Sequence, residues 1–211
     1  MTAVLFDMDG VLLASAPYMK QAFADVLKDI PFDYEATRGT SFPEKIRRIN
    51  KECNCALDVE EIREKIYEHQ FHAMENMLKP EQGVRTFIKQ LQAAKIAFRI
   101  ATSSGRVRAE RMLSIAGINA YFQDITAEED VEKQKPDPAL FLAAAKKLGV
   151  PPTECVVIED AAYGIQAAHA AGMKAIGYLG ESTEEQVRDA DLVIRSFEEL
   201  TPAIIQNLVH P

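Results

Sequence analysis

Two aspartates close to the N-terminus, Asp7 and Asp9, carry carboxylates with which the chain could bind a metal ion or take part in group transfer. They follow a short apolar run, Ala3 to Phe6, which predicts a buried strand that stops where the carboxylates begin. Gly10 then allows a sharp turn of the backbone. Ligands of open α/β sheets bind beyond the carboxyl ends of the strands. Aspartate and glycine are also common in plain turns, so this segment alone leaves both interpretations open.

Three further segments place polar side chains where predicted strands or loops end. Each has an alternative interpretation as a turn or a helix cap, because serine, threonine and aspartate are good N-cap residues. Thr102 or Ser104 could cap a helix that begins near Val107, and Asp160 could cap the helix that follows it. Four such segments in one sheet favour a functional site over four unrelated caps. The three segments are Thr102-Ser103-Ser104, Lys135-Pro136-Asp137-Pro138 and Glu159-Asp160.

Crowding of the acidic side chains predicts a bound cation. Two carboxylates about 4 Å apart repel each other by roughly 4 kcal/mol at an effective dielectric constant of about 20. A hard divalent ion such as Mg²⁺ takes oxygen ligands and relieves this repulsion. Lys135 adds a second positive charge and the Thr102 hydroxyl adds a donor, which together suit a phosphoryl group in transfer. A carboxylate nucleophile that forms an aspartyl-phosphate fits the same set. The acidic residues are Asp7, Asp9, Glu159 and Asp160.

The pattern along the chain predicts an α/β fold. From residue 81 onward, apolar strand-like runs alternate with amphipathic helical segments, which indicates a Rossmann-like, doubly wound parallel sheet. A short helix is expected to start in 181–185, with Ser182 as its cap. The predicted strands are 3–6, 96–101, 123–126, 155–158, 174–178 and 192–194. The predicted helices are 84–94, 107–116, 138–148, 161–171 and one at the C-terminal end.

Residues 14–80 break that alternation. Three helical segments are predicted there, at 17–28, 43–51 and 59–78, without a convincing strand between them. We therefore expect a core formed by residues 1–13 and 81–211, with an inserted α-helical cap domain over residues 14–80. The insertion follows the carboxyl end of the first strand, so it is placed to act as a lid.

Composition excludes several classes of partner. The 211-residue chain has a net charge of −8, which argues against nucleic acid or an anionic membrane surface. No apolar stretch approaches the roughly 18 residues of a membrane span, so we expect a cytoplasmic protein, monomeric or weakly homo-oligomeric, without a membrane partner. Cys53 and Cys55 are too few and too close together for a usual zinc site, and we expect reduced thiols.

The four polar segments resemble, in their order, the four motifs of the haloacid dehalogenase-like superfamily. Within it, the chain is similar to the β-phosphoglucomutase and phosphoglycolate phosphatase-like branch, in which a helical cap is inserted after the first motif. The resemblance covers essentially the whole chain, and it is far more specific for the superfamily than for a substrate. The matching residues are Asp7-Met8-Asp9-Gly10, Thr102, Lys135-Pro136-Asp137 and Glu159-Asp160.

This resemblance implies how a phosphoryl group would be handled. Asp7 would be the nucleophile, and Asp9 would protonate the leaving alkoxide and then activate the hydrolytic water. Thr102, the backbone amide of Ser103 and Lys135 would hold the phosphoryl oxygens. The dehalogenases lack the second aspartate of the first motif, so its presence here favours phosphate esters as substrates.

The resemblance also implies a metal cofactor, Mg²⁺. Its ligands would be the Asp7 carboxylate, the Asp9 backbone carbonyl and Asp160. Glu159 would be a direct or water-mediated partner of the ion.

The chain departs from its relatives mainly in the cap. Ala14-Ser15 replaces an Asp-Ser or Asp-Thr pair, and Met19 replaces a histidine. Phe42, in the loop Arg38-Gly39-Thr40-Ser41-Phe42, replaces the arginine that grips the second phosphate in the mutases. Without that fixed guanidinium a bisphosphate intermediate is hard to hold, although Arg38, Lys45 or Arg47 could substitute.

We therefore expect a Mg²⁺-dependent phosphatase that hydrolyses a small phosphomonoester, a sugar phosphate or similar metabolite. A β-phosphoglucomutase-like sugar phosphomutase is the alternative. A catalytically idle relative that only binds its ligand is a third hypothesis, and the crowded carboxylates argue against it, because without a metal they would cost stability.

Overall fold

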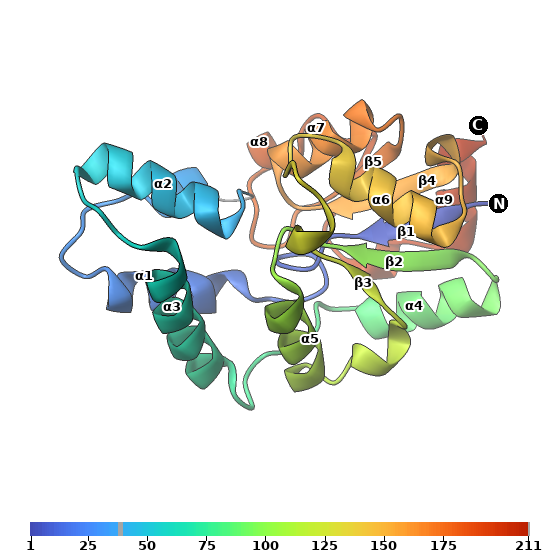
Figure 1. The fold of residues 1–211 in the computed structure, drawn as a ribbon. Coiled ribbons are helices and arrows are strands. Elements are labelled where there is room, and N and C mark those ends of the chain that lie inside the picture. Colours follow the sequence, from blue (N-terminus) through green and yellow to red (C-terminus); the bar gives the residue numbers. More distant parts are fainter. Residues whose placement is uncertain (38–39, 211) are drawn as a thin grey trace.

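The computed structural model describes residues 1–37 and 40–210. At its centre lies a six-stranded parallel sheet in the order β3-β2-β1-β4-β5-β6 (Figure 1), which confirms the predicted doubly wound fold. The strand order reverses between β1 and β4, and a ligand is expected beyond the carboxyl ends of these two strands. The strands are β1 (Ala3–Phe6), β2 (Ala97–Ala101), β3 (Ile125–Thr126), β4 (Cys155–Glu159), β5 (Lys174–Tyr178) and β6 (Leu192–Ile194).

Strand β1 is buried on both faces because helices cover both sides of the sheet. Val4 and Phe6 pack into one apolar cluster, with α4 (Val84–Ala93), α5 (Arg106–Ile115) and α9 (Pro202–Val209). Ala3 and Leu5, on the opposite face, pack with three other helices. Those helices are α6 (Ala139–Leu148), α7 (Ala162–Ala170) and α8 (Glu184–Val187).

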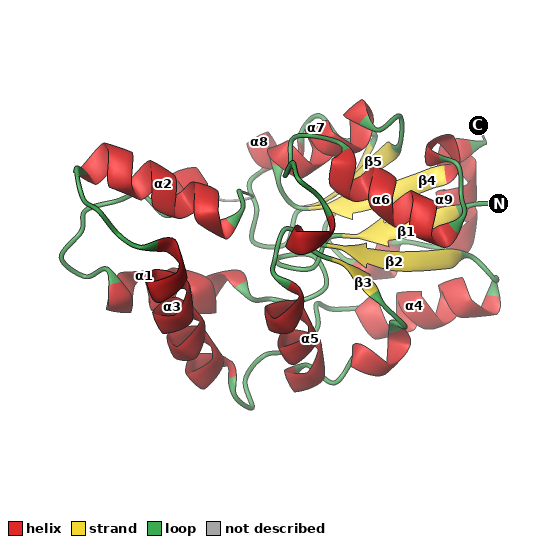
Figure 2. Cartoon of the chain, in the orientation of Figure 1, coloured by secondary structure: helices red, strands yellow, loops and turns green. Residues whose placement is uncertain are grey.

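Three more helices lie beyond the carboxyl edge of the sheet, on the left in Figure 1, and form the helical segment that the sequence predicts. They are α1 (Ala16–Val26), α2 (Phe42–Cys53) and α3 (Val59–Met74), and Figure 2 shows them joined by loops. They share an apolar cluster of their own, which includes Phe23, Ile46 and Ile66. The end of α3 packs into the cluster of the sheet through Phe71 and Met74, so α3 joins the two parts.

Several predicted boundaries differ from the structure by one or two residues, and two wrong helix boundaries have a clear physical cause. Helix α3 ends at Met74 rather than at residue 78, because Glu75 has an extended ψ of 120° and Asn76 a left-handed φ of 64°. Helix α8 begins after Thr183, whose backbone N–H donates to Gln186 Oε1 at 2.8 Å. The expected cap, Ser182, donates its hydroxyl to Asp160 instead.

Short 3-10 turns connect several of these elements. They are η1 (Glu35–Thr37), η2 (Asn119–Tyr121), η3 (Glu128–Asp130), η4 (Pro152–Glu154) and η5 (Phe197–Glu199). None of the helices within residues 1–37 and 40–210 is both long and apolar enough to cross a membrane.

The ring of Phe6 lies at the centre of a cluster of aromatic side chains within the apolar core on one face of the sheet. Its centroid lies 6.2 Å from that of Phe87, 6.3 Å from Phe98 and 6.3 Å from Phe197. We expect Phe6→Ala to lower the free energy of unfolding by about 3–5 kcal/mol, because it leaves a cavity that the surrounding rings cannot fill. Urea unfolding followed by circular dichroism measures the change as a shift of the midpoint.

Met77→Ala is the control for Phe6→Ala, because the Met77 side chain is 62% exposed. We expect it to change the free energy of unfolding by less than about 0.5 kcal/mol. Equal losses in the two variants would contradict the placement of Phe6 at the centre of the core.

Candidate active site

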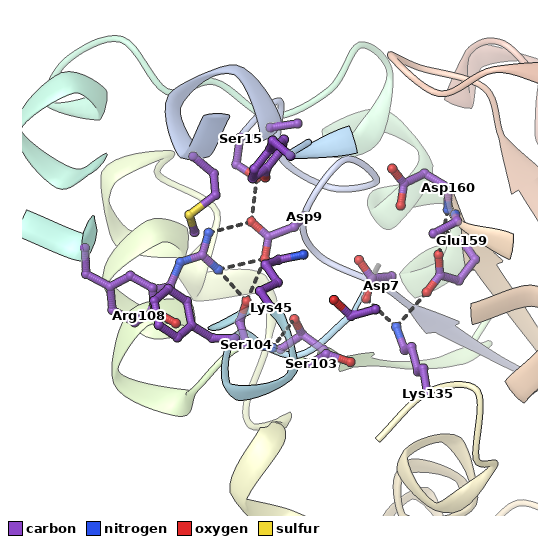
Figure 3. Close-up of a pocket in the computed structure, with 18 residues that line it drawn as sticks. Asp7, Asp9, Ser15, Lys45, Ser103, Ser104, Arg108, Lys135, Glu159 and Asp160 are labelled. Carbon is purple, nitrogen blue, oxygen red and sulfur yellow. Dashed lines mark hydrogen bonds and ion pairs between the residues drawn. The ribbon is translucent and has the colours of Figure 1, made fainter. Parts of the chain in front are cut away.

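The residues singled out from the sequence converge at the carboxyl edge of the sheet. Asp7 follows β1, Thr102 and Ser103 follow β2, and Glu159 ends β4. Lys135 lies in the loop before α6, and its peptide bond with Pro136 is cis. These residues, together with Asp9 and Asp160, line one cavity with a volume of about 100 Å³ (Figure 3). Side chains separated by as many as 153 positions in the sequence therefore meet in one place, from Asp7 to Asp160.

The Lys135 ammonium lies between two buried carboxylates. Its Nζ is 2.6 Å from Asp7 Oδ1 and 2.6 Å from Glu159 Oε1, and all three side chains are at least nine-tenths buried. Burial alone would lower the pKa of Lys135, but Asp7 and Glu159 raise it above its usual value, so the ammonium stays charged.

Three buried carboxylates lie close together at this point. Burial raises the pKa of Asp7 well above its usual value; Lys135 opposes the shift, while Glu159 and Asp160 add to it. A bound cation would lower the repulsion among the three carboxylates.

Three carboxylates are arranged so that they could hold this cation. Asp7, Glu159 and Asp160 each offer an oxygen, and these oxygens all lie within 4.8 Å of one another. A set of carboxylate oxygens suits Mg²⁺. Gly10 permits the close approach of Asp160, because a Cβ at that residue would lie 2.4 Å from Asp160 Oδ2, and its φ of +81° also disfavours any other residue.

Glu159 is held by the protein through both of its oxygens. Oε1 accepts from Lys135, while Oε2 accepts from the backbone N–H groups of Asp160 at 2.8 Å and Ala161 at 2.9 Å. The first turn of α7 packs directly on this side chain, since a Cβ at Gly164 would lie 1.8 Å from Oε1. Glu159 therefore fixes the position of Lys135 and of the turn that carries Asp160.

Asp9 has a different environment from Asp7. Its carboxylate accepts from Ser15 Oγ at 2.5 Å, from Ser104 Oγ at 2.7 Å and from both terminal nitrogens of Arg108 at 2.8 Å. Burial alone would raise the pKa of Asp9, but the guanidinium and the hydroxyls lower it to about 2. Figure 3 shows this carboxylate directed toward Arg108 and Ser15, on the side of the cavity opposite Asp7 and Lys135.

The three alternative cap assignments are wrong. Gly105, rather than Thr102 or Ser104, is the N-cap residue of α5, and Thr102 Oγ1 accepts from the backbone N–H of Ser104 at 3.1 Å. Ala161 is the N-cap residue of α7, which leaves the Asp160 carboxylate to face the cavity. The side-chain hydroxyl of Ser103 is buried and has no hydrogen-bond partner within residues 1–37 and 40–210.

Residues of the helical segment 14–80 also line the cavity. Tyr34, Phe42 and Tyr67 line it together with Lys45, whose buried ammonium donates to the carbonyl oxygen of Thr37. Of the three basic residues that could replace the arginine of the mutases, the structure describes two, Lys45 and Arg47. Lys45 faces the cavity, Arg47 pairs with Glu44 at the exposed surface of α2, and Arg38, like Gly39, lies outside the described residues.

Arg108 is the site residue that the sequence reasoning missed. It lies in the first turn of α5, where an arginine is expected to be solvated, yet it is 3% exposed. A signal was present: Arg108, Ala109 and Met112 share one face of the helix at positions i, i+1 and i+4, and that face is buried.

The chain matches the profile of the haloacid dehalogenase-like hydrolase family over residues 4–178. It is 35% identical over 216 residues to the β-phosphoglucomutase of Bacillus subtilis, a match that covers 95% of this chain and 92% of that protein. It is 32% identical over 181 residues to a fructose-1-phosphate phosphatase of Escherichia coli, which covers 82% of this chain and 94% of that protein.

The fold is also similar to solved structures. A hydrolase of this family (family IA, variant 3) from Entamoeba histolytica superposes with a TM-score of 0.88 at 27% identity, with 100% of each chain covered. One relative is much longer: the chloroplastic protein SUPPRESSOR OF QUENCHING 1 of Arabidopsis thaliana is 33% identical over 202 residues. That match covers 90% of this chain but only 19% of the plant protein.

The carboxylate cluster predicts a stabilising effect of Mg²⁺. At a hundredfold excess over the dissociation constant, an ion that binds only the folded state adds about 2.7 kcal/mol. For a domain of this size we expect a rise of roughly 5–10 °C in the thermal midpoint. Differential scanning fluorimetry with and without MgCl₂ measures it.

Asp160→Asn should lose at least half of this Mg²⁺-dependent shift. Asp189→Asn is the matched control, because the Asp189 side chain is 66% exposed, and it should keep the whole shift. An equal shift in both variants would place the ion elsewhere.

Proposed function

Since the chain belongs to the haloacid dehalogenase-like hydrolases, we propose that it is a Mg²⁺-dependent phosphatase of a small phosphomonoester, a sugar phosphate or similar metabolite. The reaction would pass through an aspartyl-phosphate on Asp7. One observation carries the proposal: a buried carboxylate at the end of β1 lies against the Lys135 ammonium and two further carboxylates, in a cavity large enough only for a small group.

In the first half-reaction, a carboxylate oxygen of Asp7 attacks phosphorus as the bond from phosphorus to the ester oxygen breaks. Lys135 and the Thr102 hydroxyl hold the non-bridging oxygens together with the backbone N–H of Ser103. Bound Mg²⁺, held by Asp7, the Asp9 backbone carbonyl and Asp160, would neutralise charge on the phosphoryl group. Because Glu159 is already held through both oxygens, its part is to position Lys135, and it would be a direct or water-mediated partner of the ion.

Asp9 exchanges protons with the leaving oxygen in the first half-reaction and with the attacking water in the second. In an in-line displacement these oxygens lie across phosphorus from Asp7. Figure 3 shows the Asp9 carboxylate turned toward Arg108 and Ser15 and away from Asp7, and we assign it to these oxygens. In the state described here Asp9 is an ionised carboxylate, so it must take up a proton when the substrate displaces part of its contacts. It then gives this proton to the departing alkoxide and later takes one from the water that hydrolyses the aspartyl-phosphate.

Residues 14–80 would act as a cap domain over the core formed by residues 1–13 and 81–211. Three aromatic side chains of this segment, Tyr34, Phe42 and Tyr67, line the same cavity as Asp7. Such a wall excludes bulk water from the phosphoryl group and selects what is attached to it.

A phosphomutase is the second candidate, because of the similarity to the β-phosphoglucomutase of Bacillus subtilis and because Lys45 brings a cation to the cap wall. The charges favour the phosphatase. Among the lining residues that the structure describes, three cationic side chains and one Mg²⁺ would exceed the four carboxylates by a single charge, which suits one phosphate dianion rather than two. The cationic residues are Lys45, Arg108 and Lys135.

Asp7→Asn tests the covalent mechanism. The amide has nearly the same shape as the carboxylate but cannot form the acyl phosphate. We expect release of phosphate from p-nitrophenyl phosphate in MgCl₂ to fall by at least about 1,000-fold. Asp189→Asn is the control and should keep wild-type activity. Turnover by Asp7→Asn within about tenfold of the wild type would exclude Asp7 as the nucleophile.

A panel of sugar phosphates, assayed with and without a sugar bisphosphate, separates the two candidate functions. A phosphatase releases free phosphate from at least one substrate whether or not the bisphosphate is present. A mutase depends on the bisphosphate for turnover and yields an isomeric sugar phosphate with little free phosphate. The second result would reverse our choice.

A further inference from the structure

Arg108 is a buried charged group to which the proposed mechanism gives no task. Its side chain is 2% exposed, and its two terminal nitrogens each lie 2.8 Å from a different oxygen of Asp9. This two-point contact between planar groups fixes both the position and the plane of the carboxylate. A lysine could supply the charge but not the plane.

The same guanidinium also contacts the cap. Its Nε donates to Gln70 Oε1 at 3.0 Å, and its centre lies 5.3 Å from the ring centroid of Tyr67. Both partners belong to α3, whereas Arg108 belongs to α5 of the core. Gln70 is completely buried, and its Nε2 has no hydrogen-bond partner within the described part of the chain, so the contact with Arg108 is what holds this amide.

Asp9 is therefore held from three directions. Ser15, the N-cap residue of α1, donates to it from the start of the cap segment, Ser104 from the loop after β2, and Arg108 from α5. Since Arg108 is itself held by α3, a movement of the cap relative to the core changes the support of this carboxylate.

We propose that Arg108 is a positioning residue, which keeps the Asp9 carboxylate on the leaving-group side of the cavity and makes its position depend on the seating of cap helix α3 through Gln70. This inference rests on the proposed phosphatase function. When the substrate is bound, one Asp9 oxygen gives up its guanidinium N–H, takes up a proton and donates it to the ester oxygen, while Arg108 keeps its contact with the other oxygen.

Two aryl phosphates of similar size separate positioning of Asp9 from other roles. p-Nitrophenyl phosphate has a leaving group that departs readily without a proton, whereas phenyl phosphate needs one. Arg108→Met should lower kcat for phenyl phosphate by about 10–100-fold. The loss of kcat for p-nitrophenyl phosphate should be at least about five times smaller than this. KM for both substrates should stay within about threefold of the wild type, since the phosphoryl contacts are intact.

Further variants and a control complete the test. Arg108→Lys should recover part of the lost kcat, and Gln70→Leu should lower kcat for phenyl phosphate by about 3–10-fold with the same preference for the better leaving group. Arg111→Met is the matched control: Arg111 lies three residues further along α5 and stacks on Phe71 of α3 at 4.0 Å, so it contacts the cap from the same helix. It should leave kcat for both substrates unchanged.

Each other result has a definite meaning. A wild type that hydrolyses neither aryl phosphate nor any sugar phosphate of the panel would overturn the proposed function itself. With an active wild type, equal losses of kcat on both substrates in Arg108→Met would show a general structural role, and a rise in KM alone would show that Arg108 binds substrate; either overturns the inference. A silent Gln70→Leu would overturn the link to the cap.

Discussion

The buried contact of Lys135 with Asp7 and Glu159 is the interaction on which the rest of the site depends. Removing one member of a buried ion pair costs about 3–5 kcal/mol, because the other charge stays without a partner. Here one ammonium serves two carboxylates, while Asp160 adds a third nearby. A bound cation would lower the repulsion among these carboxylates, which links the stability of the site to the chemistry that we propose for it.

The sheet is what brings these charges together. Phe6 of β1 pairs with Ile158 of β4, and the N–H of Asp7 donates to the Ile158 carbonyl oxygen at 3.0 Å, so Asp7 and Glu159 emerge side by side. The parallel pairing of β1 and β4 thus brings Asp7 and Glu159, which are distant in the sequence, next to each other. The apolar residues of both strands are buried on the two faces of the sheet. A shift of the strand pairing by one residue would move every side chain to the opposite face, so the observed register is strongly favoured.

Most of the fold, and the grouping of Asp7, Asp9, Thr102, Ser103, Lys135, Glu159 and Asp160 in one cavity, could be predicted from the sequence. In a doubly wound sheet the carboxyl ends of the parallel strands lie at one edge, so polar residues that follow the strands are expected to lie close together. Local patterns were less informative about contacts between the cap and the core. Arg108 was missed because its partners, Asp9 and Gln70, are distant in sequence. Ser182 was misassigned as a cap because its hydroxyl bonds across space to Asp160.

In the proposed mechanism Asp7 carries the phosphoryl group during turnover. Rapid acid quench of the enzyme with a ³²P-labelled phosphomonoester that it hydrolyses, followed by peptide mapping, would detect this intermediate. We expect label in the peptide that contains Asp7, stable in acid and released by mild base as expected for an acyl phosphate. Release of phosphate without label on the protein, or label on any other residue, would contradict this mechanism.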